Sequence, residues 1–279
     1  MLATHPDPVP AFRGRIGQDP RSGYHAVPHR YRLYLTPSCP ECLRIAVTHD
    51  LLGIGDTLPV TLLPALPDTA DGGHGALRPL YEAGSHRHPG PALAPVLGDD
   101  WTGRIVSTHA PDILRDLARW FGGPGAALRP CEAQEETETV DRLCERGVTA
   151  SAHRAGRADA DAETRDAALT DLLTALDGLE RRLAGRAYVL GCGGGPTAAD
   201  VQVWVTLVWL DTVHGRHLDG AAARRIAAHT RLWDYARRLT AHPAFGRHLD
   251  LDAITRRHRA ECGNTGVCAG APRITQRAA

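Results

Sequence analysis

The sequence predicts two domains of different class, a mixed α/β domain followed by an all-α domain. Short alternating apolar segments, typical of strands, occur within the first 110 residues. After about residue 130 the apolar residues recur at helix spacing, as in the leucines between 169 and 183. A chain of 279 residues is long enough for two cores. We expect an extended arm over 1–29, an α/β domain over 30–123, a helical domain over 130–262 and a C-terminal tail over 263–279.

Four strands and two helices are expected in the α/β domain. Pro59 favours an edge position for the second strand, because proline cannot donate a hydrogen bond to a neighbouring strand. In the helical domain, Thr197 and Asp200 form a capping-box-like start to a helix that is apolar on most faces, which predicts a central, buried position. The strands are expected at 31–35, 58–63, 94–97 and 104–107, and the helices of the first domain at 40–52 and 111–120.

Composition excludes several classes of function. The 32 basic and 32 acidic residues give a formal net charge of zero, so neither nucleic acid nor an anionic membrane is expected as a partner. No apolar run approaches about 18 residues, and the first residues lack the basic and apolar regions of a signal peptide. The seven cysteines are odd in number and scattered, which argues against a secreted disulfide framework. We therefore expect a cytoplasmic protein.

Cys39 is the most informative residue for function. It directly precedes Pro40 at the expected start of the first helix, where backbone N–H groups and the helix dipole can stabilise a thiolate. Cysteines in such positions have pKa values below the usual value of about 8.5, and the thiolate is the reactive form. Cys42 lies one helical turn away on the same face, so it can act as a resolving cysteine or simply pack in the core.

The order of these elements resembles the glutathione transferase superfamily, and within it the xi class, the glutathionyl-hydroquinone reductases. The resemblance implies a thioredoxin-like α/β N-terminal domain, an all-α glutathione transferase C-terminal domain and a homodimer. The segments that carry it are RYRLY at 30–34 with CP at 39–40, APVL at 94–97, TAAD at 197–200, LVWLD at 207–211, LWDYAR at 232–237 and NTGV at 264–267.

The resemblance also implies roles for individual residues. Cys39 corresponds to the nucleophile that removes a thiol from a hydroquinone thioether as a mixed disulfide, and a second thiol then regenerates the enzyme by exchange. Pro95 corresponds to a cis-proline, and Ala94 before it would offer backbone hydrogen bonds to the cysteinyl part of the thiol.

The positions that bind the thiol in this family differ here. His109 and Ala110 stand where the family has a Glu-Ser pair that binds the γ-glutamyl group of glutathione. Without that carboxylate and hydroxyl, the glutamyl group is left poorly paired. A different thiol without a γ-glutamyl group, such as mycothiol, is one explanation, with donors near Ser107 and Thr108 binding its sugar-like part. The expected cosubstrate is thus a low-molecular-weight thiol, glutathione or mycothiol, bound near Ala94, Pro95, Thr108 and His109.

The substrate-binding positions differ as well. Thr149 and His214 stand where the family has tyrosines. We interpret both as lining the site of a small aromatic or quinone-like molecule, with His214 as a proton donor. His214 and His217 could share a helix face, but two histidines alone are a weak indication of a metal site, and no metal is expected. The pair Cys262 and Cys268 is interpreted as incidental.

Three classes of function stay open at this point. The first is a thiol-dependent reductase or transferase with Cys39 as the nucleophile. The second is a dithiol oxidoreductase that acts through Cys39 and Cys42 without a bound thiol. The third is a non-catalytic binding subunit of the same fold. Titration of the thiols separates them, because a Cys39 pKa near or above 8.5 favours the binding subunit, whereas a Cys39–Cys42 disulfide favours the dithiol enzyme.

Overall fold

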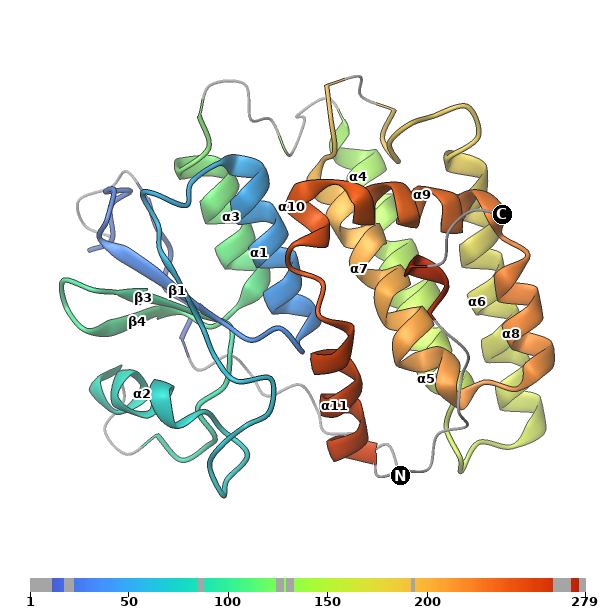
Figure 1. Cartoon of the computed structure of the whole chain (residues 1–279), viewed down its shortest axis with the longest axis horizontal. Coiled ribbons are helices and arrows are strands. Elements are labelled where there is room, and N and C mark those ends of the chain that lie inside the picture. The colour runs from blue at the N-terminus through green and yellow to red at the C-terminus, as the bar shows by residue number, and fades with distance from the viewer. Residues whose placement is uncertain are drawn as a thin grey trace. The chain divides into compact units, whose positions relative to one another are not determined.

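The computed structural model describes residues 12–17, 23–84, 88–123, 128, 133–191, 194–262 and 272–275. Two compact units make up the chain (Figure 1). One is an α/β unit that extends to Leu128 and includes Asp252–Arg257. The other is a helical unit that comprises Arg129–Leu251 and the residues from His258 onward.

The α/β unit is built on a four-stranded sheet with the strand order β2-β1-β3-β4. The first strand, β1 (Tyr31–Leu35), is parallel to β2 (Val60–Leu62) and antiparallel to β3 (Val96–Asp99). The strand β3 forms an antiparallel hairpin with β4 (Arg104–Ser107). The prediction that β2 lies at an edge is confirmed, and Pro59 contributes its carbonyl, which accepts a hydrogen bond of 3.0 Å from the N–H of Leu33.

Each face of the sheet is covered by a core of its own, because successive side chains of a strand point to opposite faces. Val96 and Ile105 belong to a core that also contains Tyr81 of α2 (Arg78–Gly84). Their neighbours Leu97 and Val106 belong to the other core, which contains apolar residues of α1 (Pro40–Leu52) and α3 (Ala110–Trp120). Figure 1 shows α1 and α3 side by side.

The helical unit is arranged around its central helix α7 (Ala198–Thr212), which is buried on nearly all sides, as its apolar sequence predicts. The predicted capping box is confirmed, because the side chain of Thr197 and that of Asp200 each accept from the other's backbone. The other elements are α4 (Gln134–Arg142), a π-helical segment Leu143–Ala150, α5 (Ser151–Ala155), α6 (Ala162–Arg182), a 3-10 helix His214–His217, α8 (Gly220–Ala227), α9 (Thr230–Ala241) and α10 (Pro243–Gly246). The last helix, α11 (Leu251–Cys262), contributes Leu251 and His258–Cys262 to this unit and Asp252–Arg257 to the α/β unit. None of the helices within the described ranges is long and apolar enough to cross a membrane.

Parts of the expected arm and tail are attached to these units. In the arm, Arg13 forms an isolated bridge with Ser107 of β4. In the tail, Arg273–Thr275 forms a single 3-10 turn. Asp211 of α7 fixes this turn by accepting from the Arg273 guanidinium at 2.9 Å and from the N–H of Ile274 at 3.1 Å. The tail residues 263–271 and 276–279 lie outside the described residues.

Candidate functional site

Cys39 is the N-cap residue of α1, with Pro40 as the first helical residue. Its side chain accepts no capping hydrogen bond from the helix. The neighbouring Cys42 thiol has the largest of the effects that lower the pKa of Cys39 below its ordinary value, and the backbone N–H groups of Cys42 and Glu41 act in the same direction, whereas burial and the Glu41 charge oppose them. Cys39 therefore has the environment of an activated nucleophile.

Cys42 has the opposite character. Its side chain is 1% exposed, and it packs in the core beneath α1. Burial, followed by the hydrogen bond to Cys39 and the charge of Cys39, raises the pKa of Cys42 well above its ordinary value. Cys39 is thus the more acidic thiol of the pair, and Cys42 is the one that keeps its proton more readily. Both are free cysteines in the structure.

The turn between β1 and α1 holds Cys39 in place. Thr36 and Ser38 are buried, and their hydroxyls donate to the carbonyls of Pro64 at 2.8 Å and of Ala65 at 2.5 Å. On the helix itself, Arg44 pairs with Glu41 at 3.2 Å, which reduces the repulsion between the Glu41 carboxylate and a thiolate at Cys39.

The Ala94–Pro95 peptide bond is cis, as the resemblance implies. It directly precedes β3. Ala94 packs against the cores on both faces of the sheet, and Cys39 packs against one of these cores, the one beneath α1 and α3.

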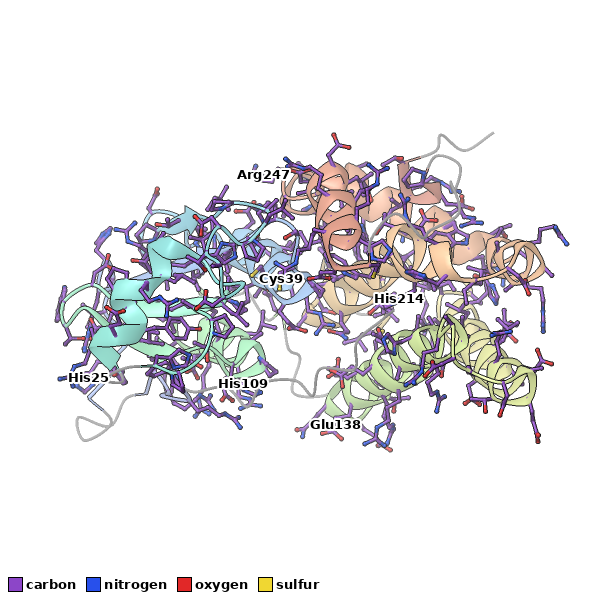
Figure 2. The ribbon with its side chains drawn as sticks, turned by 90° about the horizontal axis from the view of Figure 1, so that it is seen from below. His25, Cys39, His109, Glu138, His214 and Arg247 are labelled. Carbon is purple, nitrogen blue, oxygen red and sulfur yellow. The ribbon has the colours of Figure 1, made fainter. Side chains whose placement is uncertain are left out.

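Thr108 and His109 are occupied by contacts with the N-terminal arm. The N–H and hydroxyl of Thr108 donate to the carbonyl of Phe12 at 3.0 and 3.4 Å. His109 directly precedes α3, and its Nδ1 lies 2.9 Å from Asp112 and 3.1 Å from the guanidinium of Arg13 (Figure 2). Burial opposes ionisation of Asp112, but the bonds from Arg13 and His109 prevail and lower the pKa of its carboxyl. The Asp112 carboxylate is therefore already paired with the guanidinium of Arg13.

Thr149 lies in the π-helical segment Leu143–Ala150 and is exposed. Gly147 makes this segment possible where it passes α6, because a Cβ at that position would lie 2.5 Å from the Cβ of Ala175. Segments of this type are often found at functional sites, but no local pattern of residues predicts them. The sequence therefore indicated Thr149 by resemblance alone.

His214 begins the 3-10 helix after α7, in the helical unit. Burial, followed by the positive charges of His153, His217 and His258, lowers the pKa of His214 to about 4. The ring is therefore neutral at neutral pH, so an imidazolium acid at His214, which the sequence suggested as a proton donor, is not populated there. Two of the histidines that act on His214, His153 and His258, lie far from it in the sequence. The sequence analysis therefore did not single them out.

The same neighbourhood contains a group of potential metal ligands. Nε2 of His217 lies 3.1 Å from Nε2 of His258, and the sulfur of Cys262 lies 3.7 Å from Nδ1 of His258. Burial lowers the pKa of both histidines, so both rings are neutral at neutral pH. From the sequence, His217 was discussed together with His214, and Cys262 together with Cys268. In the structure, both His217 and Cys262 instead contact His258. Cys268 lies outside the described residues.

Comparisons with known proteins agree with this architecture. The family model for the glutathione S-transferase C-terminal domain matches residues 162–238. The glutathionyl-hydroquinone reductase PcpF of Sphingobium chlorophenolicum is 26% identical over 248 residues, which cover 82% of this chain and 78% of that protein. A solved glutathione transferase from Gordonia bronchialis is 28% identical, with a TM-score of 0.76 over 88% of this chain and 80% of that chain.

A solved xi-class glutathione transferase from Natrialba magadii has a TM-score of 0.78 at 24% identity, over 94% of this chain and 87% of that chain. The predicted fold class, a thioredoxin-like α/β domain followed by an all-α glutathione transferase domain, is confirmed. The reading as a non-catalytic subunit is set aside, since these relatives are enzymes. The chain is therefore a glutathione transferase-like enzyme, and it resembles the xi class.

Proposed function

We propose that this enzyme is a thiol-dependent reductase or transferase in which the Cys39 thiolate attacks the sulfur of a thiol conjugate. The observation that carries the proposal is the position of Cys39 at the start of α1, where the neighbouring Cys42 thiol and the backbone N–H groups of Cys42 and Glu41 lower the pKa of Cys39. Such an environment favours the anionic nucleophile. The activity of the relative PcpF, named as a glutathionyl-hydroquinone reductase, supports a thioether of a hydroquinone as the substrate.

The proposed reaction has two steps. In the first, the Cys39 thiolate bonds to the thioether sulfur, the carbon–sulfur bond breaks, and its electron pair stays on the aromatic carbon, which takes up a proton. The products are the hydroquinone and a mixed disulfide on Cys39. In the second step, the thiolate of a second small thiol attacks the mixed disulfide, which releases a small-molecule disulfide and regenerates the Cys39 thiolate.

The identity of the thiol is the finer part of the proposal. The relatives' names support glutathione. The surroundings of His109 support a thiol without a γ-glutamyl group, such as mycothiol, because an ammonium group there would meet Arg13 and His109 while Asp112 is already paired. Binding an unpaired ammonium beside these groups is unfavourable. We therefore expect mycothiol to react with the enzyme more readily than glutathione.

A direct test compares the two thiols on Cys39. The protein is incubated with the disulfide of glutathione or of mycothiol, and intact-mass spectrometry follows the mixed disulfide. Both reactions should require Cys39, so Cys39→Ser should form no adduct and lose at least about 10³-fold in reductase turnover. Full turnover in Cys39→Ser would refute the nucleophile, whereas a clear preference for glutathione would refute only the choice of thiol.

A dithiol mechanism through Cys39 and Cys42 is a second candidate, favoured by the hydrogen bond between the two thiols. The substitution Cys42→Ser separates the two mechanisms, because serine keeps a donor for Cys39 but cannot form a disulfide. Reduction of a protein or small-molecule disulfide without added thiol should fail in this variant if the dithiol mechanism operates. Thiol-dependent turnover should persist in it if the mixed-disulfide mechanism operates.

We further propose that the enzyme acts in the cytoplasm as a homodimer. A reducing compartment suits a chemistry that depends on a free thiolate. Cys39 and Cys42 are both free thiols, which is consistent with that compartment. The dimer rests on the family resemblance, and light scattering of the purified protein would measure it.

A further inference from the structure

The helical unit contains a group of three potential ligands that the proposed reaction does not use. This histidine–cysteine cluster consists of His217, His258 and Cys262. One ligand atom can be chosen from each residue such that all three atoms lie within 4.8 Å of one another. The two imidazoles approach through their Nε2 atoms at 3.1 Å, with the ring planes nearly perpendicular at 81°.

The fold positions these side chains from two separate segments. His258 and Cys262 are four residues apart in α11, so they lie on one face of the helix. His217 ends the 3-10 helix His214–His217, and 41 residues separate it from His258. The 3-10 helix is itself held close to its neighbours, since a Cβ at Gly156 would lie 2.8 Å from the Cβ of His217.

We propose that the histidine–cysteine cluster binds a divalent cation of the zinc type. Two neutral imidazoles and a thiolate are the ligands that Zn²⁺ prefers, and three protein ligands leave one tetrahedral position for a solvent molecule. With Zn–N bonds of about 2.0–2.1 Å and a Zn–S bond of about 2.3 Å, tetrahedral ligand atoms lie about 3.4–3.6 Å apart. The observed imidazole pair at 3.1 Å is close to that spacing, and ligand atoms of all three residues lie within 4.8 Å of one another, so small side-chain movements bring them to it.

A cation at this point would cross-link α11 to the 3-10 helix that follows α7. The two segments are far apart in the sequence, so the ion would restrain the C-terminal helix against the centre of the helical unit. Because the folded chain brings the three ligands together and the unfolded chain does not, binding should raise the thermal stability of the protein.

The test is titration of tag-free, metal-depleted protein with Zn²⁺ and, as a spectroscopic probe, with Co²⁺. We expect about one equivalent of cation to bind, a near-ultraviolet charge-transfer band from the cobalt–thiolate bond, and a rise in the unfolding temperature. Cys262→Ser should abolish the charge-transfer band and weaken binding by roughly tenfold or more, and His258→Gln should weaken binding similarly.

Cys39→Ser is the matched control, because it removes the reactive thiol of the other unit and leaves the cluster intact. Retention of the bound equivalent in Cys39→Ser, with its loss in Cys262→Ser, supports the proposal. Loss of that equivalent in Cys39→Ser, or no effect of Cys262→Ser and His258→Gln, overturns it, as does the failure of wild-type protein to bind. Thermal unfolding of each variant without metal shows whether it is folded before binding is compared.

Discussion

At the scale of the residue, the two cysteines of α1 owe their different character to burial and to their contact with each other. Burial raises the pKa of Cys42 most, and the contact between the two thiols lowers the pKa of Cys39 and contributes to raising that of Cys42. Cys42 is buried and Cys39 is partly exposed, so the residue with the more acidic thiol is also the more exposed one. The proposed roles of nucleophile and donor follow from this difference.

Substitutions of Cys42 should therefore change the acidity of Cys39. Alkylation of Cys39 in the wild type, followed by peptide mass spectrometry across pH, should have a midpoint below about 8.5. Cys42→Ala should move the midpoint upward, because it removes the largest of the effects that lower the pKa of Cys39. Cys42→Ser keeps a donor and should stay closer to the wild type. An unchanged midpoint in Cys42→Ala would contradict this account.

The choice of thiol can be tested at His109. His109→Glu introduces a carboxylate at the position where the family resemblance places one for the γ-glutamyl group. We expect the KM for glutathione to fall by roughly tenfold, or about 1.4 kcal/mol of binding free energy, with little gain for mycothiol. His109→Gln is the matched control, because it also removes the imidazole but adds no charge. Equal effects of the two substitutions would exclude a pairing with the glutamyl ammonium.

At the scale of the element, the start of α7 is organised by one buried carboxylate. Asp200 accepts from the N–H groups of Val189 and Thr197 at 2.9 and 2.7 Å, from the Thr197 hydroxyl at 2.7 Å, and from the Tyr235 hydroxyl at 2.6 Å. It therefore joins the loop before α7, the helix itself and α9. A capping box usually provides hydrogen-bond acceptors only for backbone N–H groups at the start of a helix. Here the Asp200 side chain also links two other segments.

Removal of this carboxylate should destabilise the protein more than removal of a single donor. Asp200→Ala leaves four buried donors without an acceptor, so we expect the free energy of unfolding to fall by about 3 kcal/mol or more. Tyr235→Phe removes one donor and should lower it by about 1–2 kcal/mol. Urea unfolding measures both variants. Similar losses in the two would mean that the backbone bonds of Asp200 contribute little.

At the scale of the whole molecule, buried ion pairs attach the N-terminal arm and the loops to the sheet of the α/β unit. Arg30 pairs with Asp99 at 2.8 Å, and the two side chains are only 8% and 0% exposed. Arg30 also donates to the carbonyl of Gly23 at 2.9 Å. Burial opposes the charge on Asp99, but the bonds from Arg30 and from the N–H of Trp101 prevail and lower the pKa of the carboxyl.

This ion pair predicts how the stability depends on pH. An unfolded Asp has a pKa of about 3.9 and the folded Asp99 a lower one, so the pair stabilises the fold fully above about pH 5 and less as the pH falls below about 4. Asp99→Asn should lower the free energy of unfolding by about 3 kcal/mol at pH 7, because it leaves the buried Arg30 charge unpaired. This difference from the wild type should become smaller below about pH 4.

The adjacent Asp100 provides the control for this experiment. Its ion pair with Arg32 has side chains that are 35% and 33% exposed, so Asp100→Asn should cost less than about 1 kcal/mol at any pH. Chemical unfolding at a series of pH values measures both variants. A constant deficit for Asp99→Asn down to pH 3 would show that the pKa of Asp99 is not lowered.

Local sequence patterns by themselves determined these elements and the position of the proposed nucleophile. The apolar alternation of 31–35 specifies β1, the apolar run of 201–210 specifies the buried helix α7, and Pro40 after Cys39 places the thiol at a helix start. These features depend on residues within a few positions of one another, so backbone geometry translates them directly into structure. The capping box at Thr197 was predictable for the same reason.

Only the tertiary structure decided which distant side chains meet. The contacts of His109 with Arg13, the approach of Gly147 to Ala175 and the histidine–cysteine cluster all join residues that lie far apart in the sequence. Such contacts depend on the packing of whole helices and on where a loop or 3-10 turn ends, which no local periodicity encodes. The sequence could therefore indicate Cys39 as the proposed nucleophile and His109 as a candidate thiol-binding position, whereas the contacts of His109 and the ligands of the proposed cation site became visible only in the folded chain.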